Sequence, residues 1–181
     1  MTSFVKSLGG PIVVMELDLW NVWGGATSNA ASKHKSSDYD FACLSREYIS
    51  VIDISDNLLV VLNDMPMDTT IVSGIRGDAA YIVRIMYGEV QDICNLINDN
   101  YYTIFNKKNI IPDNEKLSLT IRGKTVIIAD ATETKELQLG SDYHLFFDLN
   151  AGTYCISNFD ISLSEARVII HKICFASNNA D

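Results

Sequence analysis

The sequence predicts a mainly β domain of the α+β class, in which antiparallel hairpins form a sandwich or barrel-like sheet with one short helix. Three observations favour this class. Short runs of β-branched and aliphatic residues recur along the chain, turn-forming residues separate them, and helical periodicity stands out in one segment. No linker and no repeat interrupts the sequence, so residues 1–181 are expected to form a single domain.

Apolar runs bounded by turn residues indicate the strands. They predict strands over residues 11–16, 48–54, 58–63, 80–87, 117–122, 125–129, 143–149, 153–158 and 167–175. Residues 55–57, Gly123 and residues 150–152 suit tight turns. Each is therefore expected to close a hairpin between the strands on its two sides.

Two segments bear on the helix content. Near 89–98 an apolar residue returns every three or four positions, which predicts a helix. The last segment allows two interpretations, because Ser162 and Glu165 would suit a capping box for a helix over 163–175. The β-branched run RVIIHKICF favours a strand instead, and the strand at 167–175 is the prediction.

The charge balance restricts the partners. Asp and Glu number 23 against 14 Lys and Arg, and the formal net charge is −9. Such a field repels nucleic acid and anionic membranes and attracts basic partners. The chain has no run of 18 apolar residues and its start lacks the anatomy of a signal peptide. The sequence predicts a cytoplasmic protein that binds neither nucleic acid nor membrane.

The cysteines are predicted to be buried thiols. The chain has four, Cys43, Cys94, Cys155 and Cys174. None belongs to a C-x-x-C pair and all lie in or beside apolar segments, as expected in a reducing cytoplasm. Cys43 in particular, within Phe-Ala-Cys-Leu, is interpreted as a small buried hydrophobe.

Catalytic and metal signals are weak. His34, His144 and His171 are present, but no pattern pairs one of them with Cys43, and the nucleophile elbow GxSxG is absent. Asp38 and Asp40 begin an EF-hand-like spacing that lacks the glycine and the terminal glutamate. The sequence predicts no catalytic residue, no metal and no cofactor. A hydrolase using Cys43 or a serine, and a small-ligand-binding β domain, stay open as alternatives.

One region is unusually acidic. From residue 38 to residue 68 there are seven carboxylates and a single base, Arg46. Methionines beside carboxylates are typical of adaptable contact surfaces, although a solvated face is the simpler interpretation. The residues predicted to bind a partner are Glu47, Asp64, Asp68, Met65, Met67, Asp38 and Asp40.

Several segments together resemble a known family. In order along the chain they are SLGGPIVV, WGG, SDYDFACLSREYISVIDI, LVVLNDMPMDTT, YIVRIMYG and DLNAGTYCIS. This series resembles immunity protein family 21 of bacterial polymorphic toxin systems. The resemblance implies a small cytoplasmic protein, encoded beside a toxin, that binds the cognate toxin domain and blocks it by occupation. It implies no catalytic residue, and the charge balance suggests a basic toxin.

The resemblance also bears on the segment Asp38-Tyr39-Asp40. Residues that define a family whose members meet different toxins are expected to be scaffold. The two aspartates would then fix a turn by accepting backbone N–H groups, with Tyr39 packed inward. A direct contact with the partner stays open for both aspartates, and so does the oligomeric state.

Overall fold

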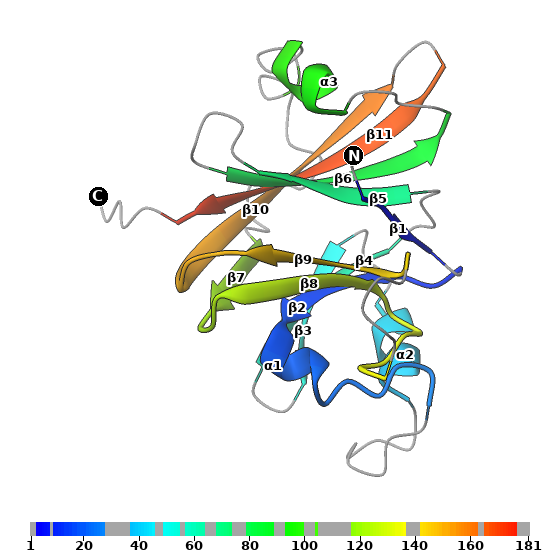
Figure 1. Cartoon of the computed structure of the whole chain (residues 1–181), viewed down its shortest axis with the longest axis vertical. Coiled ribbons are helices and arrows are strands. Elements are labelled where there is room, and N and C mark those ends of the chain that lie inside the picture. Colours follow the sequence, from blue (N-terminus) through cyan, green and yellow to red (C-terminus); the bar gives the residue numbers. More distant parts are fainter. Residues whose placement is uncertain are drawn as a thin grey trace.

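Two antiparallel sheets lie face to face, and short helices cover their outer faces (Figure 1). This arrangement is seen in a computed structural model. It describes residues 3–7, 9–27, 37–45, 49–54, 57–63, 68–73, 79–88, 93–99, 104, 117–136, 142–162 and 165–176. The predicted mainly β class, with antiparallel strands in a sandwich-like arrangement, is confirmed.

The first sheet has six strands in the order β1-β5-β6-β11-β10-β7. Its strands are β1 (Val5–Lys6), β5 (Asp68–Ser73), β6 (Ala79–Tyr87), β11 (Arg167–Phe175), β10 (Gly152–Ser162) and β7 (Leu117–Ile121). The long strands β6, β11 and β10 form its centre. The C-terminal strand β11 confirms the prediction of a strand at 167–175.

The second sheet has five strands in the order β3-β4-β2-β8-β9. Its strands are β3 (Ile49–Ile54), β4 (Asn57–Leu62), β2 (Ile12–Glu16), β8 (Thr125–Asp130) and β9 (His144–Asp148). The hairpin predicted around residues 55–57 is confirmed, because Ile54 pairs with Asn57 and Ile49 with Leu62.

Among the described residues three short helices lie outside the sheets, whereas the sequence predicted one. They are α1 (Leu17–Trp20), α2 (Asp38–Cys43) and α3 (Ile93–Asp99). In Figure 1, α3 lies above the six-stranded sheet, and α1 and α2 lie below the five-stranded sheet. Helix α3 confirms the predicted helix near 89–98, of which residues 89–92 lie outside the described residues.

Apolar side chains fill three layers. One cluster lies between the sheets and includes Val14, Val60 and Ile128. A second joins α3 to the outer face of the six-stranded sheet, and a third joins α1 and α2 to the outer face of the five-stranded sheet. Strands buried on both faces need apolar residues at successive positions. Val126 to Ala129 of β8 are all fully buried, which explains why these four successive positions are apolar.

Two predicted hairpins are wrong, although their strands are in place. Strand β7 pairs with β10 in one sheet, whereas β8 pairs with β2 and β9 in the other. Strands β9 and β10 likewise belong to different sheets. The chain therefore crosses between sheets at residues 122–124 and again at 149–151. The Leu149 N–H donates to the Lys124 carbonyl at 2.8 Å, which joins the two crossings.

Two strands were not predicted from the sequence, β1 and β5. They pair with each other at the edge of the six-stranded sheet, with Val5 opposite Thr69 and Lys6 opposite Asp68. Among the described residues, no helix is long and apolar enough to cross a membrane.

Candidate functional site

The segment Asp38-Tyr39-Asp40 forms the start of helix α2, and not the turn that the sequence predicted. The Ser37 hydroxyl accepts the Asp40 N–H at 3.1 Å, and the Asp40 carboxylate accepts the Ser37 N–H at 3.1 Å. This reciprocal capping box satisfies two N–H groups that a helix leaves without partners at its start. Asp40 therefore stabilises the first turn of α2.

Asp38 ties α2 to the Trp-Gly-Gly segment. Its side chain is 8% exposed, and its Oδ2 accepts the N–H of Gly24 at 2.7 Å. The next residue repeats the connection, since the Tyr39 N–H donates to the Gly25 carbonyl at 3.0 Å. The prediction that these aspartates accept backbone N–H groups is confirmed, within a helix.

The Trp-Gly-Gly segment packs in turn on the residues that follow β8. Trp23 Nε1 donates to the Ala131 carbonyl at 3.2 Å, and the Ala26 N–H donates to the Thr132 carbonyl at 3.0 Å. Gly25 has a φ of +54°, and a Cβ there would lie 2.4 Å from the carbonyl oxygens of Thr132 and Glu133. Only glycine fits this close approach without strain.

Tyr39 completes the assembly by packing inward, as predicted. Its ring lies against Gly10, where a Cβ would approach Tyr39 Cε2 to 2.6 Å. The Gly-Gly-Pro, Trp-Gly-Gly and Asp-Tyr-Asp segments therefore meet at one place. We call this place the motif junction and define it by residues 10, 23–26, 37–40 and 131–133.

Asp130 lies beside the motif junction and acts on the charged and polar groups around it. Asp130 is fully buried and accepts both the N–H and the hydroxyl of Thr132, at 2.9 and 2.5 Å. Burial, and then the Asp130 charge, raise the pKa of Glu133. A hydrogen bond with Cys43 is the largest of the causes that raise the pKa of Tyr39, with smaller effects from burial and from Asp130 and Asp40.

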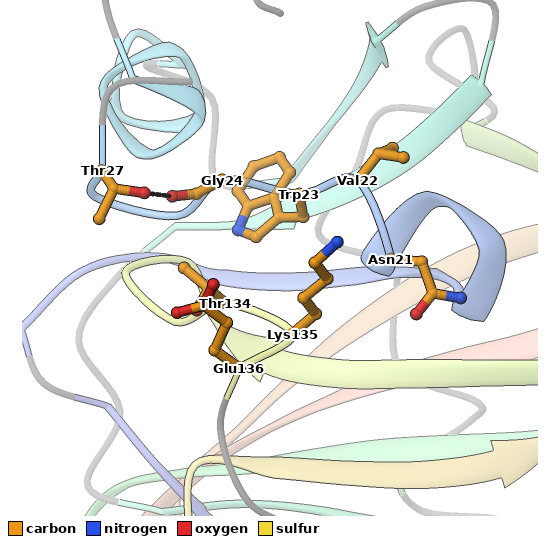
Figure 2. A pocket seen from close by; sticks show the side chains of 8 residues that line it. All are labelled: Asn21, Val22, Trp23, Gly24, Thr27, Thr134, Lys135 and Glu136. Carbon is orange, nitrogen blue, oxygen red and sulfur yellow. Dashed lines mark hydrogen bonds between the residues drawn. The ribbon is translucent and has the colours of Figure 1, made fainter. Parts of the chain in front are cut away.

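A surface pocket of about 350 Å³ opens beside the motif junction (Figure 2). Residues 21–24 and Thr27 form one wall, and residues 134–136 form the other. Val22, which is 60% exposed, lies at the rim, and Figure 2 shows the Lys135 side chain extending toward Val22 and Trp23. The Thr27 hydroxyl donates to the Gly24 carbonyl at 2.6 Å and holds its wall in place. The lining is part apolar and part polar.

The predicted partner-binding residues fall into two groups. Asp38, Asp40 and Asp68 are described, and Asp68 is the half-buried first residue of β5. The others lie outside the described residues, namely Glu47, Asp64, Met65 and Met67. A contact of any of the seven with a partner stays a prediction.

The side chain of Asn63 joins the residues that precede Glu47 to those that precede Asp64. Asn63 Nδ2 donates to the carbonyl of Ser45 at 3.2 Å and to its hydroxyl at 3.0 Å. Ser45 lies two positions before Glu47, and Asn63 lies one position before Asp64. The described ends of the two segments thus adjoin.

The prediction of a buried Cys43 is wrong. Cys43 is exposed at the last position of α2, whereas its neighbour Ala42 is fully buried against the five-stranded sheet. A helix turns successive side chains by about 100°, so the inward position falls to Ala42. Cys155 and Cys174 are half-buried thiols, and His34 and the side chain of Cys94 lie outside the description.

The two described histidines lie on strands, as predicted. His144 packs edge-on against Phe146 with ring centroids 5.1 Å apart, and burial lowers its pKa. His171 is fully buried and is hydrogen-bonded through Nδ1 to Asn158 Oδ1. In the part of the chain that the structure describes, no three His, Cys, Asp or Glu side chains gather as a metal site would require.

A buried cation was not predicted from the sequence. Arg84 on β6 has no exposed surface and donates to the carbonyls of Asn63 at 2.7 Å and Leu62 at 3.4 Å. Burial, and then the Arg84 charge, hold the pKa of His171 well below its usual value. The signal was the arginine within the otherwise apolar run YIVRIMY. Arg84 fixes the end of β4, from which the segment 64–67 departs.

Among the comparisons with known proteins, one family matches the chain. Searches of curated proteins and of solved structures found no match. The family described as Immunity protein 21 matches residues 3–166, which include the motif junction and every strand of the two sheets except β11. The resemblance noted in the sequence is therefore confirmed, and the chain belongs to the immunity protein 21 family.

Proposed function

We propose that this protein neutralises a toxin domain by binding it and occupying its working surface. The family match over residues 3–166 carries the proposal, because an immunity protein of a toxin system has a toxin as its partner. Inhibition by occupation needs no catalytic residue in the inhibitor. It needs a preformed surface whose shape and charge complement the toxin.

The surface we propose is the helical side of the five-stranded sheet, from the pocket to α2 and Ser45. Of the described residues on this side, segments 21–27, 37–45 and 130–136 form the proposed surface, and they contain one base, Lys135. Their acids number five, namely Asp38, Asp40, Asp130, Glu133 and Glu136. A basic toxin domain would be attracted to this field, and its encounter with the protein would be accelerated.

The rigidity of the motif junction supports the same surface. Hydrogen bonds join its segments to one another, so the pocket wall does not have to be ordered when a partner arrives. Binding to a preorganised surface loses less conformational entropy. Beyond Ser45, the predicted contacts Glu47, Asp64, Met65, Met67 and Asp68 would extend the surface along the flanks that Asn63 joins.

The first experiment asks whether a partner exists. The protein is purified together with the toxin domain encoded beside its gene, and binding and protection of toxin-expressing cells are measured. A complex of defined stoichiometry and full protection are expected. If the wild-type protein neither binds nor protects, the proposed function is wrong.

The second experiment asks where the toxin binds. Val22→Arg and Glu136→Lys add positive charge at the pocket, and Tyr87→Arg and Asp99→Lys make the same changes away from it. All four sites are exposed, so folding should be preserved. Val22→Arg and Glu136→Lys should slow association about tenfold at low ionic strength. The effect should be smaller at physiological ionic strength, because the Debye length there is only about 8 Å and the added charges are screened. Equal rates for the pocket variants and the controls would refute this surface.

Small-ligand binding is the second candidate, and the pocket is the observation that favours it. Its volume of about 350 Å³ is at the low end of the range for ligand pockets, about 300–1,000 Å³. Native mass spectrometry of the purified protein tests this candidate. A co-purifying small molecule that Val22→Arg removes would support it, and an unliganded mass would count against it.

A further inference from the structure

Two cysteines face each other on the neighbouring strands β10 and β11 of the six-stranded sheet. Cys155 on β10 is directly opposite Cys174 on β11 in the antiparallel register. Directly opposed residues of an antiparallel pair point to the same face. Both side chains are half-buried, on the outer face of the sheet.

The backbone pairing sets the distance between them. The Ala176 N–H donates to the Thr153 carbonyl at 2.8 Å, which makes this opposed pair a hydrogen-bonded one. Opposed pairs alternate in type along an antiparallel ladder, and Cys155 and Cys174 lie two positions further along. They too form a hydrogen-bonded pair, with Cα atoms about 5.5 Å apart. Disulfides span Cα separations of about 4.4–6.8 Å.

Both cysteines are partly exposed, and their described cross-strand neighbours are small. In the row across the sheet, Cys174 is flanked by Ala79 on β6 and Cys155 by Ser118 on β7. The apolar cluster that contains α3 lies on the same face, includes Val168 and Ile170 of β11, and reaches Ala79 beside Cys174. The partial exposure of both residues is the route by which a small thiol reagent would reach the sulfur atoms.

We propose that Cys155 and Cys174 form a redox modification site, which closes to a disulfide with a low-molecular-weight disulfide such as oxidised glutathione. The thiolate of one cysteine attacks a glutathione sulfur, forms a mixed disulfide and releases one glutathione thiolate. The second cysteine then attacks the protein sulfur of that mixed disulfide and releases the other. Two protein thiols are oxidised, oxidised glutathione is reduced to two glutathiones, and the two thiol protons pass to them.

The geometry also makes the bond reversible. Opposed Cβ atoms lie about 4.5–5.5 Å apart, at the wider end for hydrogen-bonded pairs, whereas a disulfide needs about 3.8 Å. The strands must approach each other, and a strained disulfide is more easily reduced. Phe175 is the last residue of β11 and Gly152 the first of β10, so the pair lies near one end of the ladder, where this movement is easiest. The oxidised form links the β6–β11 half of the sheet to the β10–β7 half.

The test uses the full chain and oxidised glutathione. After incubation the remaining thiols are alkylated under denaturing conditions and the protein is mapped by mass spectrometry. We expect a loss of two of the four thiols, a crosslink between the peptides of Cys155 and Cys174, and full recovery with reduced glutathione. Cys43→Ser should keep the crosslink because Cys43 is elsewhere, on α2, whereas Cys155→Ser and Cys174→Ser should each abolish it.

Four results would overturn the proposal. They are an unchanged thiol count, a stable glutathione adduct without a crosslink, a crosslink through Cys43, or a crosslink that reduced glutathione does not open. The outcome is independent of any toxin, so failure here leaves the proposed function intact.

Discussion

Replacing Asp38 by alanine tests whether the Asp-Tyr-Asp segment is structural. Asp38 is buried, and its carboxylate accepts the N–H of Gly24, fourteen residues earlier in the chain. The substitution removes this bond and leaves the buried Gly24 N–H without its acceptor. It also removes an acidic residue from the first turn of α2, where the helix dipole favours negative charge.

The two losses can be estimated. A hydrogen bond to a charged group contributes about 1.5–3 kcal/mol, and an acid in the first turn contributes about 0.3–1 kcal/mol. Asp38→Ala should therefore destabilise the protein by about 2–4 kcal/mol. At about 2–4 °C per kcal/mol for a chain of this size, the Tm should fall by about 4–16 °C. Asp38→Asn keeps an acceptor and should lose less.

Urea unfolding followed by tryptophan fluorescence measures the change, since Trp20 and Trp23 are both buried beside the motif junction. Asp53→Ala is the matched control, because Asp53 is exposed on β3 and should change stability by less than about 0.5 kcal/mol. If Asp38→Ala were as stable as Asp53→Ala, the junction would not depend on this bond. The structural interpretation of the segment would then be wrong.

Three further outcomes are expected. Gly25→Ala should cost at least about 2 kcal/mol in urea unfolding, because a Cβ at positive φ would clash with the carbonyls of Thr132 and Glu133. Cys43→Ser should change the unfolding free energy by less than about 0.5 kcal/mol, because Cys43 is exposed. Burial lowers the pKa of His171 in the folded protein, so as the pH falls the imidazole of His171 is protonated in the unfolded chain before it is protonated in the folded one. The unfolding free energy should therefore fall by up to about 1.4 kcal/mol per pH unit below about pH 6.5. His171→Gln should remove this contribution to the pH dependence. Urea unfolding at several pH values measures both.

The positions of all described strands except β1 and β5 could be predicted from local composition, whereas two of the three predicted hairpin pairings were wrong. The turn at Gly123 looks the same whether the chain folds back beside itself or crosses to another sheet. The difference lies in burial, since both faces of β8 are covered and its place is between β2 and β9. A continuous apolar run such as Val126 to Ala129 indicates burial on two faces, and it was interpreted as an ordinary hairpin strand.

The motif junction could be predicted only in part. Helix α2 spans six residues, too few for a periodic pattern, and its one local signal is the spacing of Ser37 and Asp40. That signal is weak because the capping box usually has Glu or Gln at the position of Asp40. The bond from Gly24 to Asp38 and the packing of Tyr39 on Gly10 are tertiary contacts. No spacing in the sequence specifies them.

Structural and electrostatic roles need not compete at the acidic residues. Asp38 and Asp40 accept backbone N–H groups, and such bonds hold a carboxylate in place without cancelling its negative charge. Charges fixed in a folded scaffold contribute to the field that an approaching partner meets, even when the partner never touches them. The sequence posed contact and scaffold as alternatives for this segment. In the folded protein the same two carboxylates stabilise the junction and add to the acidic field beside the pocket, so the proposed docking surface does not require them to be exposed.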